Sequence, residues 1–137
     1  MPLVIDISAI ISLALRDENP VYAEAVVDAL AETQGLVPSV FWYELWNGLA
    51  TNVCKRARLS AEDAEAFVAA VEGLGLQTAP IGVSGEVLRL CFTHGLTAYD
   101  AAYLELAQRS DAALATLDEA LRRAAIAEGV ELLLADA

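Results

Sequence analysis

Histidine, cysteine and positive charge are scarce in this chain, and each shortage argues against a class of chemistry. His94 is the only histidine and falls near a predicted loop, so we interpret it as incidental to function. Cys54 and Cys91 are the only cysteines. They lack metal-ligand spacing, so we interpret them as reduced core residues and leave a disulfide between them open. The sequence therefore offers no Ser-His-Asp triad, no Cys-His pair and no zinc site of cysteine and histidine ligands.

Long apolar runs and targeting signals are absent as well. No run approaches the roughly 20 residues that span a bilayer, and Asp6 interrupts the first apolar stretch. The N-terminus has no basic region of the kind that begins a secretory signal, so we expect a cytoplasmic protein. The 137 residues contain no repeat or linker, which predicts one domain over residues 1–137. Hydrophobic residues make up 57% of the chain, which indicates a well-filled core and apolar surface for a partner.

The charge of the chain is strongly unbalanced. It carries 20 acidic and 8 basic residues, which gives a formal net charge of −12 at pH 7. Such a surface repels nucleic acid, because phosphates require positive partners. Two interpretations remain open at this point. Either the substrate is not a polyanion, or part of the acidity is concentrated where cations neutralise it.

Short apolar runs alternate with longer helical patterns along the chain. This alternation is typical of an α/β fold with a parallel sheet. The apolar runs predict about five short strands, at residues 3–5, 35–38, 76–81, 112–116 and 130–134. Helices are predicted at about residues 8–15, 20–32, 84–93, 97–108 and 118–127, and two more begin at residues 39 and 60.

Four carboxylates are candidates for one site. Asp6 and Asp118 follow predicted strands, and ligands of open α/β sheets bind beyond the carboxyl ends of the strands. Glu44 and Asp100 lie on predicted helices that can face the same crevice. Each acid also has a structural interpretation: Asp6 and Asp118 are placed to cap helices, and Asp100 follows Thr97 at capping-box spacing. Spacing alone supports a shared site and helix capping equally.

Glu44 is the hardest of the four to explain as a structural residue. It lies mid-helix among aromatic residues, where an uncompensated carboxylate is costly. If the carboxylates converge, their repulsion must be relieved, and Mg²⁺ or Mn²⁺ with oxygen ligands does this. Such an ion also generates a hydroxide nucleophile and stabilises charge on a phosphodiester, so no histidine base is needed.

Four segments together resemble PIN domains, and most of all the VapC toxins of bacterial type II toxin–antitoxin pairs. They are VIDISA at residues 4–9, PSVFWYELWNGL at residues 38–49, LTAYDAAYLELA at residues 96–107 and LATLDEAL at residues 114–121. Each segment alone is weak evidence. All four occur in the order and spacing of the family, over nearly the whole chain.

The resemblance implies a fold, an activity and partners. The implied fold is a three-layer α/β/α sandwich on a mostly parallel sheet. The implied activity is that of a toxin, an endoribonuclease that hydrolyses RNA with Mg²⁺ or Mn²⁺. A homodimer is also implied, as is inhibition by a small antitoxin protein whose tail covers the groove. The implied metal ligands are Asp6 and Asp100, completed partly through water by Glu44 and Asp118, and the polar residues that orient them are Ser8, Asn47 and Thr116.

A basic cluster follows the helix that contains Glu44. Lys55, Arg56 and Arg58 either form a solvated helix end or clamp the RNA backbone beside the metal, and the resemblance favours the clamp. The aromatic residues at positions 41–46 are candidates for stacking on bases, although their helical spacing favours core packing for most of them. Because the net charge is so negative, we expect a structured RNA that is recognised mainly by shape.

Other functions remain open from the residues alone. A DNA-directed nuclease or a role in RNA processing is compatible with the same carboxylates. An aspartyl-phosphate phosphatase would need a second aspartate two residues after Asp6, where this chain has Ser8. A receiver-type signalling module would need a lysine near the last strand, and Lys55 is the only lysine. A catalytically silent protein-binding module is a further alternative, and Glu119 beside Asp118 has no assigned role.

Overall fold

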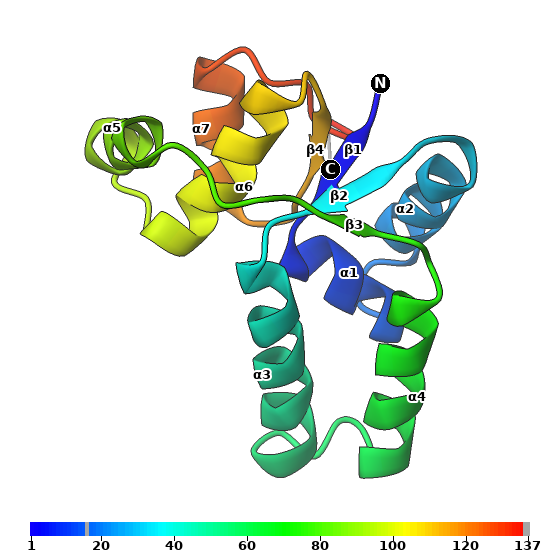
Figure 1. Ribbon diagram of the computed structural model, residues 1–137. Coiled ribbons are helices and arrows are strands. Elements are labelled where there is room, and N and C mark those ends of the chain that lie inside the picture. The colour runs from blue at the N-terminus through cyan, green and yellow to red at the C-terminus, as the bar shows by residue number, and fades with distance from the viewer. Residues whose placement is uncertain (16, 136–137) are drawn as a thin grey trace.

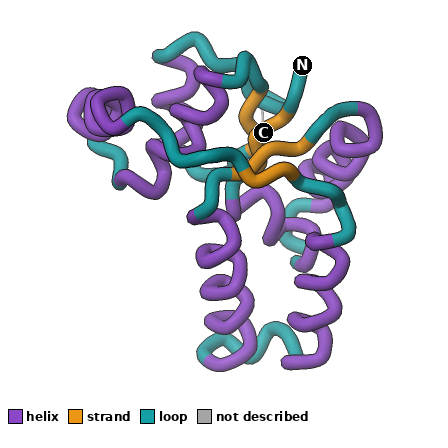
Figure 2. The backbone as a smooth tube through the Cα atoms, in the orientation of Figure 1, coloured by secondary structure: helices purple, strands orange, loops and turns teal. Residues whose placement is uncertain are grey.

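The computed structural model describes residues 1–15 and 17–135, in which helices flank a parallel sheet (Figures 1 and 2). The sheet has the strand order β3-β2-β1-β4, and its strand pairings are parallel. The strands are β1 (Leu3–Ile5), β2 (Gly35–Val37), β3 (Gln77–Thr78) and β4 (Ala113–Ala115). The helices are α1 (Ile7–Ala14), α2 (Pro20–Glu32), α3 (Val40–Cys54), α4 (Ala61–Glu72), α5 (Ser84–His94), α6 (Ala98–Arg109) and α7 (Glu119–Ala127). The predicted α/β fold with a parallel sheet is confirmed.

Strand β1 lies in the middle of the sheet and is apolar on both faces. All three of its residues are buried, and β2 and β4 pair with it on either side. A parallel strand that is covered on both faces leaves no solvated position for a polar side chain, so its sequence is a continuous apolar run. The carboxyl ends of β1 and β4 therefore lie next to each other, with Ile5 opposite Ala115.

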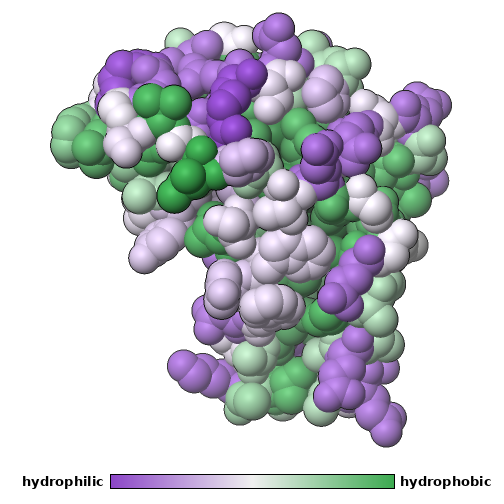
Figure 3. All heavy atoms as spheres, viewed as in Figure 1, coloured by the Kyte–Doolittle hydropathy of each residue, from purple (hydrophilic) through white to green (hydrophobic). Residues whose placement is uncertain are grey.

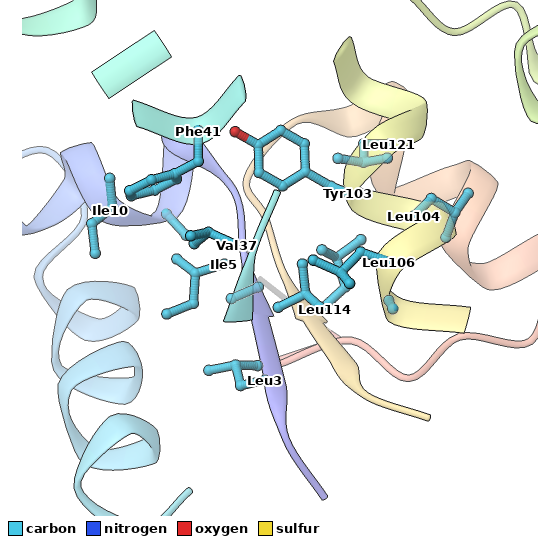
Figure 4. Packing of buried hydrophobic residues seen from close by; sticks show 14 of the residues in the cluster. Leu3, Ile5, Ile10, Val37, Phe41, Tyr103, Leu104, Leu106, Leu114 and Leu121 are labelled. Carbon is cyan, nitrogen blue, oxygen red and sulfur yellow. The ribbon is translucent and has the colours of Figure 1, made fainter. Parts of the chain in front are cut away.

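Helices cover both faces of the sheet (Figure 1). Helix α1 packs against α2 on one face, and α6 packs against α5 and α7 on the other. Figure 4 shows the apolar core on either side of β1, with Ile10 and Phe41 on one side and Leu104 and Leu121 on the other. This arrangement is the predicted three-layer α/β/α sandwich.

Strand β3 is shorter than the apolar pattern at residues 76–81 predicts. It consists of Gln77 and Thr78, which are both exposed at the edge of the sheet. Pro80 follows closely and has no N–H group to donate to a strand ladder. The chain therefore leaves the sheet before the end of the predicted run.

The predicted fifth strand at residues 130–134 is reduced to one parallel bridge between Leu132 and Leu114. Leu114 N donates to the carbonyl of Glu131 at 2.8 Å on one side of this bridge. The chain has positive φ angles at Gly129 and at Leu134, so it turns before and after the bridge. A longer ladder cannot form between these two turns.

Helices α3 and α4 form a hairpin that projects from the sheet (Figure 2). They pack against each other, and α3 also packs against α1. Cys54 is the last residue of α3 and is exposed, so its prediction as a core residue is wrong. Cys91 on α5 is partly buried against the core, and both cysteines are free thiols. Among the described residues, no helix combines the length and apolar character that a membrane span requires.

Candidate active site

Asp6 is the first residue after β1 and the most deeply buried of the four candidate acids. Only 3% of its surface is exposed. Its Oδ1 accepts hydrogen bonds from Ala9 N at 3.0 Å and from Ser8 Oγ at 2.7 Å, and its Oδ2 accepts one from Thr116 Oγ1. These donors are neutral, so the buried negative charge is hydrogen-bonded but not neutralised.

Thr116 follows β4 and connects the end of that strand to the end of β1. Ser8 and Thr116, which both bond with Asp6, also accept hydrogen bonds from the backbone beyond β4. Ser8 Oγ accepts one from Leu117 N at 2.8 Å, and Thr116 Oγ1 accepts one from Asp118 N at 3.0 Å. Two hydroxyl groups therefore tie the start of α1 to the segment that carries Asp118.

The carbonyl of Thr116 is held by two long side chains. It accepts hydrogen bonds from Arg122 Nη1 at 2.7 Å and from Tyr22 OH at 3.3 Å. Arg122 is buried, and its Nη2 also donates to the carbonyls of Leu134 and Ala135, each at 2.9 Å. Neither Arg122 nor Tyr22 had a predicted role. The Tyr22 bond joins residues 94 positions apart, and the Arg122 bonds depend on the turns of the chain before and after α7.

Glu44 lies half-buried in α3, and its partner is Tyr103 on α6. The Tyr103 hydroxyl donates to Glu44 Oε1 at 2.6 Å, and the Tyr103 side chain is buried. This bond compensates a carboxylate that lies among aromatic side chains. Tyr103 had no predicted role. A usable signal is its spacing from Asp100, because residues three apart on a helix share one face.

Electrostatic repulsion links the four acids. Burial, together with the charge of Asp100, raises the pKa of Asp6 to about 6, against the effect of its hydrogen bonds. Burial is also the main cause that raises the pKa of Asp100, followed by the charge of Asp118. The pKa of Glu44 is raised by burial and by the charge of Asp100, against the effect of the Tyr103 hydrogen bond. Asp100 is therefore the electrostatic neighbour of the other three acids.

Helix capping accounts for part of this arrangement. Asp6 is the N-cap of α1, and Asp118 is the N-cap of α7, where its Oδ1 accepts a hydrogen bond from Leu121 N at 2.8 Å. Thr97 caps α6 by accepting a hydrogen bond from Asp100 N at 3.1 Å. The capping interpretation is confirmed for Asp6 and Asp118, and for Asp100 the Thr97 half of the capping box is present. It engages only one oxygen of Asp118, so it does not exclude a second role for that carboxylate.

The chemistry of the donor set fits a hard divalent cation. The donors are carboxylate oxygens, and no ion pair between described residues involves any of the four acids. In the part of the chain that the structure describes, no three His, Cys, Asp or Glu side chains are spaced to hold one ion. Mg²⁺ is usually bound by only one or two carboxylates and keeps several waters, so this spacing still suits it. Asp6 and Asp100 are the candidates for those two ligands.

The predicted orienting residues differ in where the structure places them. Ser8 and Thr116 both bond directly with Asp6. Asn47 is exposed on α3, one turn after Glu44, and its side chain forms no hydrogen bond to a described residue. The functional roles of all three stay predictions.

The basic cluster lies at the far end of the α3–α4 hairpin. Lys55 is roughly 16 Å from Glu44 along the helix, at 1.5 Å per residue, and Lys55, Arg56 and Arg58 are exposed. Arg58 forms ion pairs with the acidic side chains of residues 17 and 18. The cluster is therefore separated from the carboxylates, and its contact with RNA stays a prediction.

His94 and Glu119 lie outside this network. His94 Nε2 is 2.7 Å from Glu128 Oε2, and Arg89 Nη2 donates to Glu128 Oε1 at 2.8 Å. His94 thus takes part in a contact between α5 and the end of α7. Glu119 is exposed in the first turn of α7.

Comparison with known proteins identifies the family. The PIN domain matches residues 3–127, and the chain belongs to the PIN domain family. The predicted resemblance to PIN domains is confirmed. Proteins with this domain are in general nucleases, and they generally use divalent metal ions. A comparison with curated protein sequences gave no match.

Several solved structures share the fold at low sequence identity. The crystal structure of PAE2754 from Pyrobaculum aerophilum is 24% identical, with a TM-score of 0.69 over 97% of this chain and 84% of that one. VapBC2 from Rickettsia felis, bound to a DNA fragment from its promoter, is 14% identical, with a TM-score of 0.68 over 96% of this chain and 97% of that one. FitAcB from Neisseria gonorrhoeae is 20% identical, with a TM-score of 0.61 over 96% of each chain.

Proposed function

We propose that this protein is an endoribonuclease that depends on Mg²⁺ or Mn²⁺ and acts as the toxin of a toxin–antitoxin pair. The observation that carries the proposal is the set of four carboxylates whose charges act on one another at the carboxyl edge of β1 and β4. Membership of the PIN domain family supports a nuclease. A site made of acids, with no histidine bonded to it in the described chain, suits hydrolysis of a phosphodiester by an activated water.

In this proposal the four acids divide into two pairs. Asp6 and Asp100 hold the ion, and Glu44 and Asp118 complete the site, partly through water. When bound, Mg²⁺ supplies stabilisation of the charge on the phosphodiester and activation of the attacking water. The raised pKa values of Asp6, Asp100 and Glu44 support a bound cation, because a nearby positive charge relieves the repulsion that helps to raise them.

Neutral hydrogen bonds would keep these carboxylates in place before the ion binds. Ser8 and Thr116 hold the two oxygens of Asp6, and Tyr103 holds Glu44 Oε1 while Oε2 is left for the site. Partners of this kind orient metal ligands in general, and their loss weakens metal binding. Asn47 would act from the exposed side of α3.

The proposed partners are RNA, an antitoxin protein and a second copy of the chain, in the cytoplasm, with residues 1–137 acting as one domain. The likeness to VapBC2 and FitAcB supports a complex with an antitoxin. Large exposed apolar side chains, such as Ile126 on α7 and Val21 on α2, support contact with protein partners. The cluster of Lys55, Arg56 and Arg58 is the proposed contact with the RNA backbone away from the cleavage point.

Cleavage of defined oligonucleotides tests the proposal. The protein is incubated with single-stranded RNA, and with DNA of the same sequence, in Mg²⁺, Mn²⁺ or EDTA. We expect cleavage of RNA alone, which EDTA abolishes. Asp100→Asn should lower kcat/KM at least about 100-fold, the upper end of the loss seen when even a supporting residue of a metal site is removed.

Asp28→Asn is the matched control, because it makes the same chemical change at an exposed position of α2. It should leave kcat/KM unchanged. Circular dichroism would show that both variants are folded. Full activity of Asp100→Asn, or cleavage that persists in EDTA, would contradict the proposal.

A further inference from the structure

A hollow of about 450 Å³ opens along α6, the helix that carries Asp100. It lies between the start of α3, the length of α6, the first half of α5 and the segment 80–82. Val40 in its wall precedes Glu44 by one helical turn, and Tyr99 in its wall is adjacent to Asp100. The hollow is therefore next to the candidate site along α3 and α6, although none of the four acids lines it.

The rim of the hollow is apolar and highly exposed. Ile81 exposes 93% of its surface and Tyr99 62%, and Leu88 is exposed as well. Figure 3 shows apolar side chains gathered on the surface around α5. Single exposed apolar residues are normal in proteins, whereas several of them around one hollow mark a binding site.

The polar part of the hollow is an ion pair that is fixed in place. Glu105 is buried, and its oxygens accept hydrogen bonds from Arg109 Nε at 2.8 Å and from Arg109 Nη2 at 3.1 Å. Arg109 Nη2 also donates to Pro80 O at 3.1 Å, which holds the rim segment. Gly82 packs directly on this pair, since a Cβ at that position would overlap Glu105 Oε1. Apolar walls with a few fixed polar groups are the usual form of a site for a small cyclic ligand.

Few of the basic side chains that the structure describes are available to bind RNA phosphates. Four of the basic side chains that the structure describes are already engaged: Arg58, Arg89 and Arg109 in ion pairs, and Arg122 with backbone carbonyls. The net charge of −12 works against binding to phosphates. Contacts with bases must therefore supply much of the binding. Stacking on an aromatic side chain is such a contact, and every base has a face that allows it.

We propose that this hollow is a nucleobase subsite of the nuclease, in which the base beside the scissile phosphate stacks on Tyr99. The proposal rests on the nuclease function above and names its substrate more closely. The polar edge of the base faces Glu105 and Arg109, and its ring lies between Tyr99 and the apolar wall. The substrate must present an unstacked base at this position, as single strands and loops of RNA do.

Tyr99→Ala and an abasic nucleotide test this contact together. Loss of the stack should lower kcat/KM for single-stranded RNA by about 5- to 150-fold, the effect of one base–aromatic stack. An abasic nucleotide beside the scissile phosphate should lower wild-type kcat/KM by a similar factor and have little further effect on Tyr99→Ala. Tyr99→Trp keeps an aromatic face and should keep the activity.

Phe92→Ala is the matched control. It removes another exposed aromatic side chain, from a part of α5 that does not line the hollow. It should leave kcat/KM and the response to the abasic nucleotide unchanged. Sedimentation velocity on each variant should give the wild-type mass.

Three results would overturn the subsite. Equal losses for wild type and Tyr99→Ala on the abasic substrate would show that this base does not contact Tyr99. A changed mass for Tyr99→Ala would show that a second copy covers the hollow. Unchanged kcat/KM for Tyr99→Ala would show that the hollow does not bind a base and would favour a protein segment as its occupant. If wild type cleaves no RNA, the proposed function fails by itself, and the same comparison, measured as Kd for the oligonucleotides in EDTA, still decides the subsite.

Discussion

Asp6→Asn should stabilise the protein above pH 7 when no divalent cation is present. Folding raises the pKa of Asp6 from 3.8 to about 6, mainly through burial. Each pKa unit corresponds to about 1.36 kcal/mol, so the ionised Asp6 lowers the free energy of unfolding by about 3 kcal/mol. Asparagine keeps the size and the capping ability of aspartate and removes its charge. The asparagine amide must form a new hydrogen bond with Thr116. We therefore expect the free energy of unfolding to rise by about 1 to 3 kcal/mol.

The effect of Asp6 depends on pH in a defined direction. Below about pH 3 the carboxyl is largely protonated in both the folded and the unfolded protein, and its charge costs little. Between about pH 4 and 6 the folded protein retains the proton and the unfolded chain releases it. The free energy of unfolding of wild type therefore falls as pH rises, by up to about 1.36 kcal/mol per pH unit. Above about pH 6 to 7 the full cost is present.

Urea denaturation between pH 4 and 8 in EDTA measures this difference. Asp28→Asn serves again as the control for the same chemical change at an exposed position. Added Mn²⁺ should reduce the difference in unfolding free energy between Asp6→Asn and wild type at pH 8, because an ion at 100 times its Kd stabilises the folded wild type by about 2.7 kcal/mol. The reasoning is wrong if Asp6→Asn is less stable than wild type at pH 8 in EDTA, or if the difference between them does not change with pH.

Two further changes test the contacts around the site. Tyr103→Phe removes the donor to Glu44 Oε1 and should cost about 1.5 to 3 kcal/mol of unfolding free energy at pH 8, and less at a pH that protonates Glu44. Urea denaturation at the two pH values measures this, and equal losses would contradict a charged acceptor. Arg122→Met leaves the Thr116 carbonyl with Tyr22 as its remaining side-chain donor and should cost about 3 kcal/mol. Arg122→Lys should not restore the loss, because lysine lacks the planar fork of donors, and wild-type stability of Arg122→Met would show that strand pairing alone holds this segment.

The elements with a strong pattern follow directly from the sequence. The apolar run of β1 and the long helices α2 and α6 lie within a few residues of their predicted bounds. The fifth strand does not, because pairing at the edge of a sheet depends on backbone turns. Positive φ angles at Gly129 and Leu134 limit it to one bridge. Apolar character alone does not specify such turns.

One topological rule predicts that two of the four candidate acids lie close together. Asp6 comes directly after β1 and Asp118 three residues after β4, and the rule places residues beyond the ends of neighbouring parallel strands together. The bond between Tyr103 and Glu44 joins residues 59 positions apart, which no local pattern encodes. Helix length alone indicates that Lys55 lies far from Glu44, since the two are separated by three turns of α3.

The hydrogen bond between Asp6 and Thr116 joins positions 110 residues apart. This separation affects when the site can form during synthesis of the protein on the ribosome. Chains emerge with the N-terminal part first, so Asp6 leaves the ribosome long before the segment that completes its surroundings. A growing chain therefore has no finished site, and a prematurely terminated one never acquires it. The site is complete only when the segment that carries Thr116 and Asp118 has left the ribosome and has folded against β1.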